Sequence, residues 1–107
     1  MRKKTKMSAK LLKALNYSSM EEAALDIMIL SARSKYAEFR QEAKRFEEKY
    51  GMDFVPFQRT VEARINKEDF EQEKDLMAWR FAQEAADYWR QRIEELERAA
   101  GLDEALP

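Results

Sequence analysis

Cysteine and histidine are both absent from this chain of 107 residues. Without cysteine there can be no disulfide, no thiolate metal site and no cysteine nucleophile. Without histidine the chain lacks the commonest general base and the commonest metal ligand. A di-iron carboxylate bundle is excluded for the same reason, because its motif requires Glu-x-x-His. We therefore expect no cofactor, no metal site and no catalytic residues, and an enzyme is not the class that we favour.

Glycine and proline are scarce, with two of each, and the chain holds only two valines and four isoleucines. A glycine-rich phosphate loop is excluded, since the two glycines are Gly51 and Gly101. Few turn formers and few β-branched residues, beside abundant Ala, Glu, Lys, Arg and Leu, are typical of helical proteins. The longest apolar run, Ile27 to Leu30, is far shorter than the roughly 20 residues of a membrane span. The composition predicts an all-α protein with no membrane contact, and we expect it in the cytoplasm.

Charge is distributed unevenly along the chain. Residues 1–20 carry six basic side chains and no acidic one, whereas the remainder carries 14 basic and 21 acidic residues. This asymmetry predicts a basic N-terminal arm, residues 1–17, with a possible short helix, followed by a helical hairpin domain, residues 18–107. The arm can bind nucleic acid weakly and without sequence preference, or it can be a solvated terminus. Its candidate contact residues are Arg2, Lys3, Lys4, Lys6, Lys10 and Lys13.

Capping signals divide the chain into helices. Ser19 and Glu22 have the spacing of a capping box, which predicts a long helix over about residues 20–50, and Gly51 is placed to end it. Asp75 is a candidate cap for a second long helix over about 75–100, after a polar break from residue 66 to residue 74.

Two short helices are also expected. One spans about residues 8–15, with Thr5 or Ser8 as its cap, and the other spans about 54–65, with Asp53 as its cap. The corner aromatics Tyr50, Phe54 and Phe57 are expected to cover the end of the bundle.

Apolar residues in both long segments follow alternating spacings of three and four. The first seam is Leu25, Ile29, Ala32, Tyr36, Phe39, Ala43, Phe46 and Tyr50, and the second is Trp79, Ala82, Ala86, Trp89, Ile93, Leu96 and Ala100. Large side chains alternate with alanines in each, which lets two helices approach closely. The pattern predicts a long antiparallel hairpin crossing at roughly 20°. Both tryptophans are interpreted as core residues.

Several apolar residues do not fit these seams. Phe81, Ala85 and Tyr88 form a second stripe, and residues 27–30 are apolar nearly all round the helix. They must meet the short helices, a second copy of the chain in a dimeric bundle, or another protein. The candidate interface residues are Ile27, Met28, Leu30, Phe81 and Tyr88.

Two acidic pairs, Glu68 with Glu71 and Glu84 with Asp87, match the pattern of magnesium-dependent nucleotide pyrophosphatases. That activity requires the pairs on facing helices. Residues 75–83 instead read as part of the same helix as the second pair, and a core Trp79 turns Glu84 and Asp87 outward. We interpret these acids as a solvated helix face and keep the pyrophosphatase as a third hypothesis.

One segment resembles a known group of proteins. Lys49-Tyr-Gly-Met-Asp-Phe54 with Phe57, then Phe70-Glu-Gln-Glu73, Asp75, Trp79 and Tyr88-Trp89, resembles small uncharacterised helical proteins of bacteria and archaea. These look like the antitoxins of type II toxin–antitoxin pairs. The likeness covers residues 34–98, and it departs from the group's pattern at Pro56 and Arg80, where acidic residues are more usual.

The resemblance implies a protein that neutralises a cognate toxin by binding it and contacts operator DNA through a basic segment. We accordingly expect a non-catalytic interaction protein that binds its partner through surplus apolar helix faces. The alternative is a homodimeric helical scaffold with weak nucleic-acid binding through the N-terminal arm.

Overall fold

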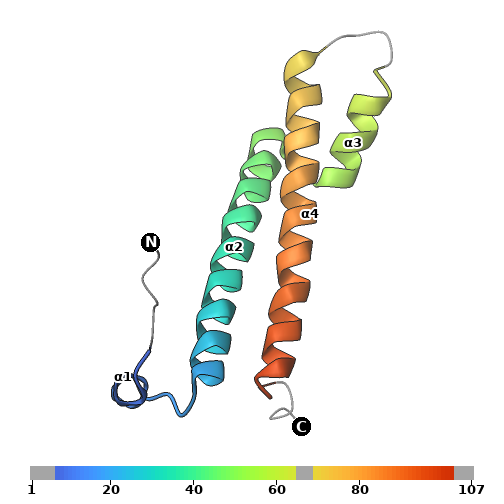
Figure 1. Ribbon diagram of the computed structural model, residues 1–107. Coiled ribbons are helices and arrows are strands. Elements are labelled where there is room, and N and C mark those ends of the chain that lie inside the picture. The colour runs from blue at the N-terminus through green and yellow to red at the C-terminus, as the bar shows by residue number, and fades with distance from the viewer. Residues whose placement is uncertain (1–6, 65–68, 103–107) are drawn as a thin grey trace, which may run out of the picture.

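The computed structural model describes residues 7–64 and 69–102, and Figure 1 shows their arrangement. These residues form four helices, α1 (Ala9–Ala14), α2 (Met20–Tyr50), α3 (Phe54–Glu62) and α4 (Phe70–Ala99), and no strand. Helices α2 and α4 lie side by side in opposite directions, and α3 packs against the first half of α4. The predicted all-α fold with a hairpin of two long helices is confirmed. None of the described helices is both long enough and apolar enough to span a membrane.

The start and the end of α2 follow the predicted signals. The Ser19 hydroxyl accepts a hydrogen bond from the Glu22 amide at 3.0 Å, and Gly51 ends the helix in the left-handed conformation at φ 63°. Ser8 caps α1 by accepting from the Leu11 amide, whereas Thr5 lies outside the described residues. Asp53 precedes α3 without making a side-chain cap bond, and α3 ends at Glu62.

The predicted start of the second long helix was wrong. Helix α4 begins at Phe70, five residues before the predicted start, and its cap is Asp69, which accepts from the Gln72 amide at 3.1 Å. Residues 71–74 are polar, but Glu, Gln and Lys are good helix formers, so their polarity was a poor reason to expect a break. Asp75 therefore lies in the second turn of α4, where its carboxylate faces α2.

The two seams meet as the alternation predicts. Ala32 and Ala43 of α2 and Ala82 and Ala86 of α4 are buried, so the backbones approach closely at these positions. The other buried residues are Ile29, Phe57, Leu76 and Trp79. Ala100 is exposed because α4 ends one residue before it.

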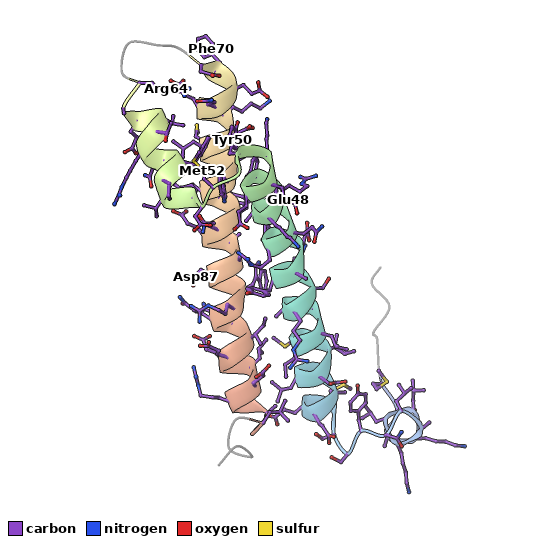
Figure 2. The ribbon with its side chains drawn as sticks, turned by 180° about the vertical axis from the view of Figure 1, so that it is seen from behind. Glu48, Tyr50, Met52, Arg64, Phe70 and Asp87 are labelled. Carbon is purple, nitrogen blue, oxygen red and sulfur yellow. The ribbon has the colours of Figure 1, made fainter. Side chains whose placement is uncertain are left out.

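Trp79 is the centre of the core. It is fully buried, and the rings of Phe46 and Tyr50 from α2 and of Phe54 and Phe57 from α3 lie 5.2–6.4 Å from it between centroids. The corner aromatics thus surround Trp79 instead of covering the end of the bundle. The early start of α4 explains this correction, because Phe70 lies beyond the corner formed by Tyr50 and Met52 (Figure 2). Among the described residues the indole N–H of Trp79 has no hydrogen-bond partner, so the ring contributes through packing.

Charged groups join α2 to α4 beside this core. Lys49 Nζ lies 2.7 Å from a carboxylate oxygen of Asp75 and 2.8 Å from one of Glu71, while the Tyr50 hydroxyl donates to Asp75. Burial and the bond to Asp75 raise the pKa of Tyr50 to about 12. Burial alone would raise the pKa of Asp75, but the hydrogen bonds from Lys49 and Tyr50 outweigh it and lower that pKa.

Replacing Trp79 by Ala should lower the free energy of unfolding by about 3–5 kcal/mol, because the truncation leaves a cavity between three helices. Trp89→Ala is the matched control, since Trp89 belongs to the same seam but is partly exposed, and we expect a smaller loss. Urea denaturation followed by circular dichroism measures both values. Equal losses at the two positions would contradict the central place of Trp79.

The raised pKa of Tyr50 predicts a loss of stability in alkali. A phenol whose pKa is higher in the folded than in the unfolded state contributes stability that is complete below about pH 10 and lost as the pH rises to about 12. Urea denaturation between these pH values should show a shallower decline for Tyr50→Phe than for the wild type. Tyr88→Phe, which removes a hydroxyl from an exposed ring, should keep the wild-type decline. A wild-type slope in Tyr50→Phe would refute the assignment.

Candidate protein interface

Helix α2 carries a second line of small and apolar residues on the side facing away from α4. Ile27 lies about 160° around the helix from the buried Ile29, at roughly 100° per residue. We call this line the outer face of α2; its spacing of 3, 4, 3, 4 and 3 runs through Met20, Ala23, Ile27, Leu30, Ser34 and Ala37. Ile27 is 59% exposed and Leu30 is 55% exposed. No charged residue occupies the line over these five turns.

Helix α4 carries a different exposed line, which we call the α4 stripe. Its members are Phe70, Met77, Phe81, Ala85 and Tyr88, and the four large side chains are 71%, 69%, 62% and 51% exposed in that order. Phe81 lies about 200° around the helix from Trp79, so the stripe points away from the core. Its only aromatic contact to α2 among the described residues is an edge-on one to Phe39, at 5.8 Å between centroids.

The five predicted interface residues do not form one surface. Ile27 and Leu30 lie on the outer face of α2, whereas Phe81 and Tyr88 lie on the α4 stripe. Met28 is turned about 100° from Ile27 and lies on the side of α2 that is near the α4 stripe. There it lines a groove of about 380 Å³ between the two long helices, together with Tyr88, Trp89 and Arg92.

Phe70 and Met77 were missed as interface candidates. The signal for them was in the sequence, because counting back from Phe81 by four gives Met77 and by a further seven gives Phe70. Because a break was expected before Asp75, residues 70–74 were not treated as helical and the stripe was not extended to Phe70. Phe70, Met77 and Phe81 line a hollow of about 540 Å³ together with Glu42, Glu73, Lys74 and Ala78.

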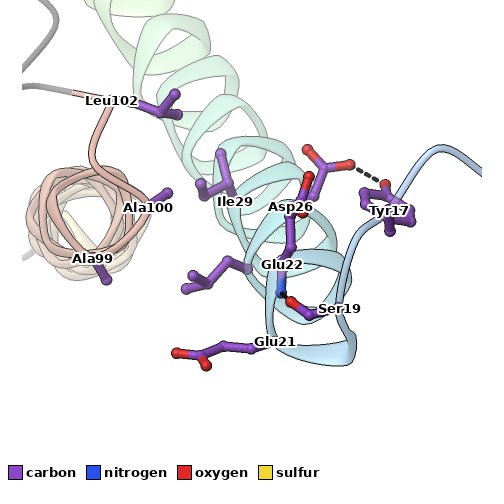
Figure 3. Close-up of a pocket in the computed structure, with 10 residues that line it drawn as sticks. Tyr17, Ser19, Glu21, Glu22, Asp26, Ile29, Ala99, Ala100 and Leu102 are labelled. Carbon is purple, nitrogen blue, oxygen red and sulfur yellow. Dashed lines mark hydrogen bonds between the residues drawn. The ribbon is translucent and has the colours of Figure 1, made fainter. Parts of the chain in front are cut away.

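A second groove lies between the start of α2 and the end of α4 (Figure 3). It has a volume of about 500 Å³, and Leu25, Ile29 and Leu102 provide its apolar lining. Tyr17 closes one side by donating to Asp26, and this hydrogen bond raises the pKa of the phenol. The polar contact fixes the linker that joins α1 to α2.

Glu22 and Asp26, two of the acidic residues that line this groove, are engaged in local hydrogen bonds. Glu22 accepts from the hydroxyl and the amide of Ser18, which lowers the pKa of its carboxyl group. Across residues 7–64 and 69–102 no group of three or more acidic side chains is arranged to hold a metal ion.

The acidic pairs of the pyrophosphatase pattern do not lie on facing helices. Glu71, Glu84 and Asp87 all belong to α4, and 13 residues of helix separate Glu71 from Glu84 by about 20 Å. Glu84 and Asp87 are exposed, and Asp87 pairs with Arg90 at 2.6 Å. Glu68 lies outside the described residues. The interpretation of residues 75–83 as part of the helix that carries Glu84 and Asp87, with both acids turned outward, is confirmed. Glu71, which was expected to lie in a polar break, belongs to the same helix.

Of the six basic residues predicted to contact nucleic acid, Lys10 and Lys13 are exposed on α1, which contains no buried residue. Arg2, Lys3, Lys4 and Lys6 lie outside the described residues. The division into an arm and a hairpin domain stays a prediction.

The molecule is extended for its length. Its radius of gyration is 20.6 Å, whereas a compact chain of this length has about 13 Å. Two long helices with one short helix at the side leave each long helix with one face that no other described element covers. Both apolar lines are therefore consequences of the architecture.

No family model matches the chain, and neither a curated protein nor a solved structure matches it. The resemblance to antitoxins stays a prediction.

Removing residues 1–13 tests the basic arm. Because α1 contributes nothing to the core, the truncation should change the free energy of unfolding by less than about 0.5 kcal/mol. Binding to a fluorescent DNA duplex, measured by anisotropy, should be lost from the truncated chain, and in the full chain it should weaken steeply between about 50 and 200 mM salt. Truncated protein that binds DNA as tightly as the full chain would exclude the arm as the contact.

Proposed function

We propose that this protein is a non-catalytic interaction protein that binds a cognate partner protein through the outer face of α2. The observation that carries the proposal is an uncharged line with helical spacing from Met20 to Ala37, turned away from the hairpin core. Seventeen residues of helix make this line about 26 Å long. A solvated helix face is normally charged, so an uncharged face of this length is typical of a contact surface.

The chemistry of the face indicates what kind of partner it suits. Ile27 and Leu30 provide large apolar contacts, while Ala23, Ser34 and Ala37 leave room for another backbone to approach. Met20, Ile27 and Leu30 are each about half-buried already. Burying the rest of these side chains against a partner contributes about 3 kcal/mol in total to the free energy of binding. An amphipathic helix with apolar residues at the same spacing of three and four is the ligand that such a surface accepts.

Antitoxin is the class of interaction protein that we propose. The acidic body is suited to a basic partner, since residues beyond position 20 carry seven more acidic than basic side chains. The basic arm is suited to operator DNA. The absence of cysteine supports a place in the reducing cytoplasm. A homodimeric scaffold is the second candidate, and the exposed α4 stripe favours it.

Ile27→Lys should abolish partner binding, because it places a charge in the middle of the outer face of α2. Gln41→Lys is the matched control: the same side chain is introduced on the outward side of the same helix, 14 residues or about 21 Å away. A partner captured by the wild-type chain from cells of its source organism is identified, purified and titrated against all three proteins by calorimetry. We expect a loss of roughly thirtyfold or more in affinity for Ile27→Lys and little change for Gln41→Lys.

Equal affinity of the partner for the wild type and Ile27→Lys would refute the outer face of α2 as the site. Failure of the wild-type chain to retain any stoichiometric protein would instead count against an interaction protein of this kind.

A further inference from the structure

The α4 stripe has an internal symmetry centred on Phe81. Phe70 and Arg92 each lie 11 residues from Phe81, Lys74 and Tyr88 each lie seven residues from it, and Met77 and Ala85 each lie four. All of these residues fall on the side of α4 that faces away from Trp79. In an antiparallel pair of identical helices with a two-fold axis at Phe81, each member of such a couple lies opposite the other member in the second copy.

The residues brought together in this way are complementary. Met77 of one copy lies opposite Ala85 of the other, so a large side chain meets a small one. Lys74 lies opposite Tyr88, and Arg92 lies opposite Phe70, so each cation meets an aromatic ring. The ring of Tyr88 already accepts a cation within one chain, since the guanidinium carbon of Arg92 is 4.7 Å from its centroid.

The charges within the stripe agree with the same direction. A parallel pair would place Lys74 against Lys74 and Arg92 against Arg92 in its interface, where like charges repel. In the antiparallel arrangement each of these cations lies opposite an aromatic residue of the other copy.

We propose that two copies of this chain associate through their α4 stripes, antiparallel and with Phe81 on the two-fold axis. A two-fold interface requires a self-complementary surface, whereas binding to a different protein does not. The outer face of α2 points away from α4, and it shares no residue with the stripe. The dimer therefore leaves both α2 faces free, and the proposal does not depend on the one made for α2.

Sedimentation equilibrium tests the association. The wild type should be a dimer at micromolar concentration. Phe81→Lys should raise the dissociation constant of the dimer roughly a hundredfold, since both copies then place a lysine at the two-fold axis. Met77→Lys should also weaken the association, and it should leave the core intact because the Met77 side chain is 69% exposed. Ile27→Lys should remain dimeric, and circular dichroism verifies that all variants keep their helices. A monomeric wild type, or lysine variants that dimerise as the wild type does, would overturn the proposal.

Disulfide trapping tests the direction, because the chain has no cysteine of its own. A mixture of Met77→Cys and Ala85→Cys proteins should form the mixed disulfide dimer on oxidation. Tyr88→Cys alone should not cross-link, since the two copies of position 88 would be 14 residues or about 21 Å apart along the helices. Efficient cross-linking through position 88 would show a parallel pair and exclude the arrangement proposed here.

Discussion

The burial of one indole ring, that of Trp79, determines how the three longer helices are arranged. Two aromatic rings from α2 and two from α3 pack on it, so a single side chain of α4 joins both neighbours. The ring is nine residues into its helix, and the corner between α2 and α3 must reach it there. As a result, the first two turns of α4 extend beyond the corner, and Phe70 at their start is exposed.

The same arrangement explains why the chain has so much uncovered apolar surface. A hairpin of two helices can bury one seam, and α3 covers only part of one side of α4. The remaining faces differ in chemistry. The outer face of α2 is small, aliphatic and uncharged, which is suited to a helix packed close to the backbone. The α4 stripe is aromatic and carries cations, which is suited to a surface with its own aromatic rings.

Much of the fold was predictable from the sequence because its determinants are local. The N-cap at Ser19, the stop at Gly51 and the alternation of alanines with large residues depend on neighbours within a few positions. The predicted start of α4 was wrong because polarity was taken as a sign of a break, although the polar residues 71–74 have high helix propensity. That error also misassigned Asp75, whose partners Lys49 and Tyr50 are more than 20 residues away in the sequence and become neighbours only when the hairpin closes.

The candidate surfaces were harder to predict than the core, because they depend on the direction in which each side chain points around its helix. A buried seam is recognised by its period alone, but an interface also requires knowing which of the remaining directions is covered. Ile27, Met28 and Leu30 are close in sequence, yet successive residues turn by about 100°, so Met28 points to a different side of α2 from Ile27 and Leu30. Only the position of α4 shows that Met28 belongs with Tyr88 and that Ile27 and Leu30 do not. The outer face of α2 and the α4 stripe lie on different helices and share no residue, so self-association and partner binding need not compete. Since both surfaces are built on helices that Trp79 holds together, the core ring fixes the spacing between them, and with it the geometry of any assembly that uses both.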